Sequence, residues 1–446
     1  EICACLVGSE MCIRDRFRAL KEAIKVVMEP KDDEKSISSF QALMVSTASR
    51  VGTGNIAGIS TALCIGGAGA MFWMWLIALL GSASAFIEST LAQIYKRKAA
   101  DGSSYGGPAY YIQAVLKKRW LGVLFAAVLI VTYMGGFNMV AAFNISDSFR
   151  RYDFYQPGTT PLVIGLILAV IFGICIFGGS KRISKITEVI VPVMGIFYIA
   201  VSLFIVITHL NLLPGVIVSI FKGAFDISAI FGGFAGSAVM QGVKRGLFSN
   251  EAGVGSAPNA AASAGVSHPV KQGLVQMLSV YIDTIVICSA TGFMLLCSGV
   301  VPEEGIAGMP YVQEAVAGSL GGFGSVFITV ALFLFAFTTL IGNFYYAEMG
   351  LRYICDKTPK KMIMNIFRIA AALIVCMGAT MDFSVVWDTA DVLMGLMALI
   401  NLPVIVLLAK PALRCMQDYF KQKKSGKNPV FKAKDINLET KTDFWN

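Results

Sequence analysis

The stretch FQALMVSTASRVGTGNIAGISTAL, residues 40–63, is long and apolar enough to cross a bilayer, yet its middle is rich in glycine. A spanning helix needs about 20 mostly apolar residues, but the run GTGNIAG at 52–58 carries three glycines within seven residues. Because glycine permits backbone conformations outside the helix, the run predicts a spanning helix that is interrupted halfway. Close packing of membrane helices is the alternative explanation of such glycines when the run is taken alone.

The composition of the 446-residue chain is that of a membrane protein. Hydrophobic residues make up 56% of it and charged residues 15%, whereas soluble chains of this size carry more charge. The net charge of +9 resides in short loops between apolar runs, so it indicates membrane topology, and no nucleic-acid partner is expected. Ten cysteines without a C-x-x-C motif predict neither disulfides nor a metal site.

Ten apolar stretches are long enough to cross a bilayer. Basic residues gather in the loops after the second, fourth, sixth and eighth stretches and at both ends of the chain, whereas the opposite loops hold few. Because Lys and Arg resist translocation, we expect a multi-pass protein of the inner or plasma membrane with both termini in the cytoplasm. The predicted spans are residues 40–63, 69–95, 120–143, 161–179, 184–209, 228–248, 272–298, 323–349, 362–381 and 384–409.

Ten spans divide into two sets of five, and an odd number per set inverts the second set relative to the first. The predicted fold class is an all-α polytopic membrane protein, a five-plus-five inverted repeat with discontinuous first and sixth helices. The second interruption is expected at Gly232, Gly233, Gly236 and Ser237. The predicted parts are a cytoplasmic segment 1–38 (with 1–15 interpreted as non-native), repeats 39–212 and 213–410, and a cytoplasmic tail 411–446.

A helix broken in mid-membrane exposes peptide groups that lipid cannot satisfy. Its free N–H groups attract a carboxylate, and its free carbonyls suit a hard cation such as Na⁺, so an amino acid and a sodium ion are the expected ligands. The predicted sodium ligands are Ala48, Val51, Thr338 and Thr339. The predicted substrate-binding residues are Gly52, Thr53, Gly54, Asn55, Phe137, Asn138 and the four residues of the second interruption.

Alternatives stay open for the polar residues of the spans. Membrane threonines often bond the carbonyl one turn earlier instead of an ion. Ionisable residues in spans normally face a cavity or each other, so they predict a gate, a structural pairing or a proton relay. These residues are Arg50, Glu88, Asp283, Asp388 and Asp391. Lys244, Arg245 and Glu251 belong to a charged run that is interpreted as a cytoplasmic continuation of the sixth span, a gate or a structural latch, with a solvated loop as the alternative.

Five stretches of the chain resemble the alanine or glycine:cation symporter family. They are GTGNIAG at 52–58, GGAGAMFWMWLIALLG at 66–81, GGPAYYI at 106–112, GVKRGLFSNEAGVGSAP at 242–258 and WDTADVLMGLMALINLP at 387–403. The resemblance implies a leucine-transporter-like fold, with Gly52 to Asn55 on the unwound first core helix. It also implies that Thr338 and Thr339 belong to a sodium site. Similar proteins carry a further membrane helix where this chain has residues 1–15.

The resemblance also implies symport of alanine or glycine with Na⁺, less often H⁺, by alternating access. A pocket of glycine backbone closed by phenylalanine holds little more than a methyl group, which favours alanine, glycine or serine. No enzymatic activity and no organic cofactor are expected, because the chain has no phosphate-binding loop, nucleophile elbow or zinc motif. The sequence leaves the coupling ion and the oligomeric state open, and a monomer is one possibility. The alternative function, of a different class from a symporter, is an ion channel or a subunit of a membrane complex.

Overall fold

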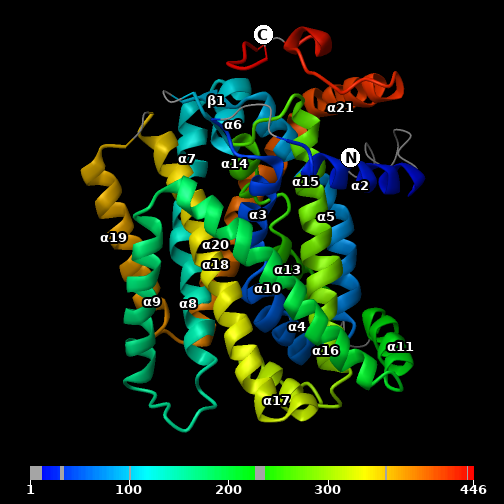
Figure 1. The fold of residues 1–446 in the computed structure, drawn as a ribbon, viewed down its shortest axis with the longest axis vertical. Helices are drawn as coiled ribbons and strands as arrows, with labels where there is room; N and C mark the ends of the chain where they lie inside the picture. Colours follow the sequence, from blue (N-terminus) through cyan, green and yellow to red (C-terminus); the bar gives the residue numbers. More distant parts are fainter. Residues whose placement is uncertain are drawn as a thin grey trace.

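The computed structural model describes residues 13–30, 35–99, 102–226, 237–356, 359–438 and 440–445, and they form an almost entirely helical bundle (Figure 1). The two strands are two-residue segments that pair antiparallel. The elements up to residue 226 are α2 (Ile13–Val27), α3 (Ser39–Arg50), η1 (Gly54–Gly58), α4 (Ile59–Gly66), α5 (Ala70–Ile94), β1 (Arg97–Lys98), β2 (Ser104–Tyr105), α6 (Pro108–Leu116), α7 (Arg119–Ile130), η2 (Val131–Phe137), α8 (Asn138–Asp147), α9 (Thr160–Ile176), α10 (Ser180–Thr208) and α11 (Leu213–Ala224).

The second half of the chain continues the same pattern of long apolar helices. Its elements are α13 (Ala238–Asn250), α14 (Ala257–Ala262), α15 (Pro269–Val280), η4 (Tyr281–Cys288), α16 (Ser289–Leu296), η5 (Glu304–Ile306), α17 (Met309–Leu320), α18 (Gly322–Ile354), α19 (Lys361–Gly378), α20 (Phe383–Leu407), α21 (Ala409–Lys424) and η6 (Ala433–Ile436). The segments η1, η2 and η4 are π-helical, a rare form that often occurs at functional sites.

Among the described residues, seven helices are long and apolar enough to cross a membrane, and three shorter apolar helices accompany them. Nine of the ten predicted spans coincide with these helices, the first of them in its second half, and the predicted fold class is confirmed. The sixth predicted span, 228–248, is described only from residue 237, where α13 lies, and the short apolar helix α11 was not predicted as a span. Large apolar side chains on the outer helices are exposed, for example Val170 on α9 and Ile196 on α10, as expected of surfaces that face lipid. In order, the spans are α3 with α4, α5, α7 with α8, α9, α10, α13 with α14, α15 with α16, α18, α19 and α20.

Both ends of the chain lie at one face of the bundle, the upper face in Figure 1, which we call the terminal face. The helices α2, α6 and α21 lie at this face, and α11 and α17 lie at the opposite end (Figure 1). Helix α18 passes through the middle of the bundle and packs against α3, α7, α8 and α10. The centre of the molecule is therefore a layer where the first, third and eighth spans meet.

The first span is interrupted as predicted. Helix α3 begins with a capping box, in which Ser38 and Gln41 satisfy each other's backbone N–H groups, and it ends at Arg50. Val51 leaves the helix with φ −76° and ψ 87°, and the chain resumes as the π-helical segment η1 and then α4. The interruption itself is confined to Val51 and Gly52, which is narrower than the predicted run 52–58.

The sixth span is also interrupted, at a position beyond the predicted one. Residues 251–256 separate α13 from α14, and two glycines there, Gly253 and Gly255, have positive φ values of 79° and 93°. Glycine adopts such values without steric strain, so these two positions allow the chain to leave one helix and begin the next. Of the predicted interruption, Gly232, Gly233 and Gly236 lie outside the described residues, whereas Ser237 caps the start of α13 by accepting from the Met240 N–H.

Candidate functional site

The gap in the first span is closed by a side chain of the same segment. The N–H of Gly52 donates to Asn55 Oδ1 at 2.8 Å, and the Asn55 N–H donates back to the Gly52 carbonyl at 3.3 Å. Asn55 is fully buried. The Gly52 N–H, predicted to bind a substrate carboxylate, is therefore bonded within the chain in this conformation, while Thr53 beside it is buried.

The amide of Asn55 joins a set of buried groups that we call the central polar cluster: Asn55, Ser249, Asp283 and Thr284. Asn55 Nδ2 donates to Asp283 Oδ1 at 2.7 Å and to Ser249 Oγ at 3.1 Å. The hydroxyls of Ser249 and Thr284 donate to Asp283 Oδ2 at 2.6 and 2.9 Å. All four residues have no exposed surface. The cluster thus surrounds one carboxylate with neutral hydrogen-bond donors, a set of oxygen-rich groups that suits a hard cation.

Asp283 was predicted only as a gating or structural charge, and its place at the first interruption was missed. It lies on η4, 228 residues along the chain from Asn55. A π-helical turn carries one extra residue and so re-aims the side chains that follow it. Asn55 and Phe137 belong to the two other π-helical segments, so each of these irregular turns supplies a residue to the site.

The two predicted sodium-site threonines have different surroundings. Thr339 Oγ1 lies 3.1 Å from the carbonyl of Ala48 and 3.4 Å from that of Ser49, across the end of α3. Thr338 Oγ1 instead donates to the carbonyl of Phe335 at 2.9 Å and contacts Met194 Sδ at 3.8 Å. Thr339 Oγ1 also lies 3.0 Å from the Phe335 carbonyl, so both threonines bond their own helix, as is common for membrane threonines. Of the two, it is Thr339 that the structure also brings together with Ala48.

Val51 and Gly52 pack tightly at this point. The Val51 N–H donates to the Thr47 carbonyl at 2.7 Å, and a Cβ added to Gly52 would lie 2.0 Å from Thr339 Oγ1. Only glycine allows the first span and α18 to approach this closely. Gly52, which was predicted to bind the substrate, therefore allows the predicted cation ligands Ala48 and Thr339 to lie close together.

An aromatic triad, Phe137, Phe248 and Trp387, covers the glycine-rich segment. The ring of Phe248 lies 4.7 Å from that of Phe137 and 4.8 Å from that of Trp387. A Cβ on Gly54 would meet Phe248 at 3.1 Å, and one on Gly58 would meet Trp387 at 3.6 Å. Phe137 was predicted as a wall of the pocket; Phe248 and Trp387 were not, although both lie inside the family-like stretches of the sequence.

Asn138 lies beside Phe137 but faces another partner. Its Oδ1 accepts from Asn343 Nδ2 at 3.0 Å, and Asn343 Oδ1 accepts from Ser49 Oγ at 2.7 Å. Ser49 Oγ also lies 3.1 Å from Glu251 Oε1. Asn138 is therefore linked through α18 to the end of α3, and from there to the second interruption.

Carboxylates hold the second interruption in place. Glu251 accepts from Ser256 Oγ at 2.6 Å as well as from Ser49. Glu88 accepts from Asn401 Nδ2 at 2.8 Å and from the Gly253 N–H at 3.4 Å. The charge of Arg50 attracts Glu88, Glu251 and Asp283, but its one direct hydrogen bond within the described residues is to the Gln276 carbonyl at 3.5 Å. The ion-pair partner of Arg50, which the sequence left open, is thus not assigned by any direct contact within the described residues.

A charged pair joins α13 to α20 beside the aromatic triad. Asp391 lies within ion-pair distance of Arg245 and 3.5 Å from Lys244 Nζ. The Arg245 guanidinium also lies 4.6 Å from the Trp387 ring, a favourable cation–π distance. Asp388, on the other side of Trp387, is exposed. The contacts of Arg245 fit a latch between the two helices.

Known proteins resemble this chain over most of its length. The sequence profile described as "Sodium:alanine symporter family" matches residues 8–433. The amino-acid carrier protein AlsT of Bacillus subtilis is 46% identical, over 96% of this chain and 90% of its own length. The probable sodium/glutamine symporter GlnT of the same organism is 46% identical over 94% and 87%. The sodium/alanine symporter AgcS of Methanococcus maripaludis is 38% identical over 88% and 87%.

Solved structures support the fold. The crystal structure of MhsT in complex with L-phenylalanine superposes with a TM-score of 0.58, covering 83% of this chain and 89% of that chain at 14% identity. A manganese transporter of Eremococcus coleocola superposes with a TM-score of 0.55 over 91% and 81% at 12% identity. These two show the fold alone. Because the family profile and the sequence relatives cover nearly the whole chain, this protein belongs to the sodium:alanine symporter family.

Proposed function

We propose that this protein takes up a small neutral amino acid together with Na⁺ by alternating access. The central polar cluster is the observation that carries the proposal, because it places one buried carboxylate directly against the interruption of the first span. Neutral donors compensate a buried carboxylate only in part, and burial of an unpaired charge is expensive. A cation that binds there relieves this cost, and it does so next to the peptide groups that would receive the substrate.

We propose two separate sites for a coupling cation, both close to the first interruption. One is the central polar cluster, and the other is formed by the Ala48 carbonyl and the Thr339 hydroxyl. A carboxylate can accept either Na⁺ or H⁺, whereas a carbonyl–hydroxyl pair suits only a metal cation. Among the relatives, the Bacillus sp. PS3 protein is named a sodium/proton-dependent alanine carrier, and two sites of different chemistry would accommodate both ions.

The substrate is expected to lie between η1 and the aromatic triad. A Cβ added to Gly54 would lie 3.1 Å from the Phe248 ring, and one added to Gly58 would lie 3.6 Å from the Trp387 ring, so the space left for the side chain of a bound amino acid is small. Alanine and glycine fit this restriction. Since one relative is named a glutamine symporter, glutamine is the informative competitor in any uptake assay.

Access from the two sides of the membrane is assigned to different contacts. We take the terminal face as cytoplasmic because its loops are basic, and the repeats as residues 39–212 and 213–410. Helix α13 reaches the interruption with its last turn, so Arg245, further back along the helix, lies on the outer side of the site. The Arg245–Asp391 contact would then close the outer entrance, and α14 would close the inner one.

The test is uptake of labelled alanine into proteoliposomes under separate Na⁺ and H⁺ gradients. We expect Na⁺-driven uptake that is electrogenic, since each positive charge moved is driven by about 2.3 kcal/mol per 100 mV. Asp283→Asn should abolish coupled uptake, while Asp388→Asn, which changes an exposed carboxylate, should retain it. Uptake that is unaffected by either gradient, or full coupling in Asp283→Asn, would remove the central polar cluster from the mechanism.

A further inference from the structure

The tail that follows α21 folds back onto the terminal face and ends in two aromatic rings around a buried lysine. The Nζ of Lys96 lies 4.7 Å from the Phe444 ring and 4.8 Å from the Trp445 ring. Lys96 is 3% exposed and Trp445 is 7% exposed. Trp445 Nε1 donates to the Gln93 carbonyl at 2.8 Å. The tail therefore encloses the last turn of α5, where an ammonium between two rings is strongly attracted because water is excluded.

The same turn of α5 holds the end of the inner half of the sixth span. Lys96 Nζ donates to the Ala264 carbonyl at 3.3 Å, and Gln93 Nε2 donates to the same carbonyl at 2.9 Å. Ala264 lies just beyond α14, whose last carbonyls have no partner within the helix. A positive charge at a helix C-terminus is favourable. Lys96 thus bridges the tail on one side and the end of α14 on the other.

The end of α14 is also where the terminal face is closed. The Ile37 N–H, just before α3, donates to the Ser263 carbonyl at 3.2 Å, and the Gly265 N–H donates to the Ile37 carbonyl at 3.0 Å. Tyr345 of α18 contacts Ser263 Oγ at 2.8 Å. The inner halves of both broken spans are therefore joined at this point, and any opening toward the terminal face must separate them.

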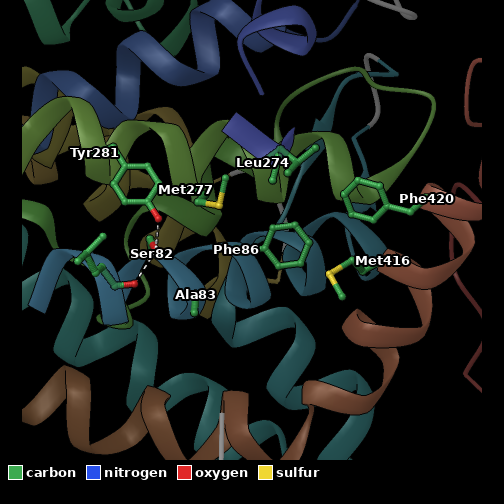
Figure 2. Close-up of a pocket in the computed structure, with 10 residues that line it drawn as sticks. Ser82, Ala83, Phe86, Leu274, Met277, Tyr281, Met416 and Phe420 are labelled. Carbon is green, nitrogen blue, oxygen red and sulfur yellow. Dashed lines mark hydrogen bonds between the residues drawn. The ribbon is translucent and has the colours of Figure 1, made fainter. Parts of the chain in front are cut away.

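Helix α21, which precedes the tail, packs on α5 and α15, and the tail continues along the start of α15. Figure 2 shows Met416 and Phe420 of α21 on one side of a pocket that Phe86 of α5 and Leu274 of α15 also line, with the hydrogen bond between Ser82 and Tyr281 at the other end. Further along, the Phe431 N–H donates to the Ser267 carbonyl at 3.0 Å, and Lys271 Nζ donates to Asn428 Oδ1 at 3.1 Å as well as to Glu29 at 2.6 Å. The family profile ends at residue 433, so the two rings belong to a part of the chain that it does not cover.

We propose that Lys96, enclosed by Phe444 and Trp445, is a positioning residue that keeps the inner half of the sixth span closed, so that the tail restrains opening toward the terminal face. This inference rests on the proposed function, since restraint of one face matters only in a protein that alternates between two. Release of the rings leaves Lys96 free to turn into solvent. The end of α14 then loses a charged donor, and the inward-open conformation gains population.

The experiment compares variants that differ only in the contact of Lys96 with Phe444 and Trp445. Trp445→Ala and Lys96→Met remove the attraction, whereas Lys96→Arg retains a cation between the rings and should behave as wild type. Val430→Ala changes an exposed side chain of the same tail and is the matched control. Amide hydrogen exchange of residues 257–265 and 35–40 is measured in detergent, together with the melting temperature and the Na⁺ dependence of alanine uptake.

We expect Trp445→Ala and Lys96→Met to exchange ~10-fold faster in those two segments only, as the strength of a buried cation–π contact implies. The Na⁺ concentration for half-maximal uptake from the outer side should rise by a similar factor, because the outward-facing fraction falls. Unchanged exchange in the two segments, or an increase spread over α9 and α19 with a lower melting temperature, would reduce the tail to a general stabilising element. Trp445→Phe, which retains a ring, replaces Trp445→Ala if the latter does not fold. If wild type shows no coupled uptake, the proposed function fails. The exchange measurement still decides whether the contact of Lys96 with Phe444 and Trp445 holds the end of α14.

Discussion

The two interruptions differ in length and in the groups that close them. The first spans only Val51 and Gly52 and is closed by the amide of Asn55 and the hydroxyl of Thr339. The second spans residues 251–256, turns through two glycines with positive φ, and is held by the carboxylates of Glu251 and Glu88. The groups that close the first interruption are neutral and release a hydrogen bond at low cost, whereas Glu88 and Glu251 bond residues of the second interruption itself through charged oxygens. The first interruption is therefore suited to ligand exchange, and the second to fixing the geometry around it.

The largest effect is expected from Gly52→Ala. A Cβ at this position would lie 2.0 Å from Thr339 Oγ1, so either α18 or the interruption must move, at a cost on the order of 3 kcal/mol. Uptake should fall to background and the melting temperature should drop. Gly173→Ala is the control, because nothing lies within 4 Å of its added Cβ on α9. Normal uptake by Gly52→Ala would mean that close approach at the first interruption is unnecessary.

Glu251→Gln should separate stability from ion binding. The amide keeps one acceptor but loses the charge that strengthens the bonds from Ser49 and Ser256, so we expect a loss of about 2 kcal/mol of stability. The Na⁺ concentration for half-maximal uptake should stay within twofold of wild type. Glu314→Gln, on an exposed position of α17, should change neither quantity. If the Na⁺ concentration for half-maximal uptake rises in Glu251→Gln, ligand exchange takes place at the second interruption and not at the first.

Thr339→Ala should show the reverse pattern. Removal of the hydroxyl beside the Ala48 carbonyl is expected to raise the Na⁺ requirement of uptake ~10-fold, a change of about 1.4 kcal/mol, with little change in melting temperature. Thr338→Ala, whose hydroxyl contacts Phe335 and Met194 and not the end of α3, is the neighbouring control. Equal Na⁺ dependence in the two variants would contradict the assignment of the cation to Thr339.

The smallest effect concerns acid stability at a position remote from both interruptions. His268 begins α15: its Nδ1 accepts from the Val270 N–H at 3.2 Å, and its Nε2 lies 3.2 Å from Asp418. Burial lowers the pKa of His268 from 6.5 to about 4, against the opposing attraction of Asp418. The unfolded chain therefore binds more protons, so this contribution to stability is complete above pH 6.5 and declines between pH 6.5 and pH 4.

For wild type we expect about 1 kcal/mol of stability to be lost at pH 5.5 through this group. His268→Asn keeps a favourable N-cap acceptor without a titrating ring, so its melting temperature should depend less on pH over the same interval. The comparison is made by thermal unfolding at pH 7.5 and pH 5.5. Identical pH dependence in the two proteins would show that other groups dominate acid unfolding.

The arrangement of spans could be predicted from the sequence because each depends on local composition. Apolar length alone located nine of the ten spans and the α13 part of the sixth, and the glycines at 52–58 located the first interruption. The second interruption is marked by Gly253 and Gly255, but these lie in a polar stretch that hydropathy assigns to a loop. A glycine run inside the preceding apolar segment was the stronger local signal, and that run lies outside the described residues.

The central polar cluster could not be predicted, because its members are far apart in the sequence. Ser249 and Asp283 meet Asn55 only after three spans have packed together, and a lone aspartate in an apolar run does not indicate its partners. The π-helical segments add to the difficulty, since one extra residue per turn changes which side chains face the centre. The folded tail was missed for a related reason: Trp445 is 352 residues along the chain from Gln93, which it contacts.

The closure of the first interruption by Asn55 affects the rate at which a bound substrate dissociates. A carboxylate that takes the Gly52 N–H must first displace an oxygen already 2.8 Å away, so one hydrogen bond replaces another and the net gain in affinity is small. When the cargo departs, the amide returns, and no bare peptide group is left in the middle of the bilayer. Such an arrangement sacrifices tight retention and favours rapid turnover.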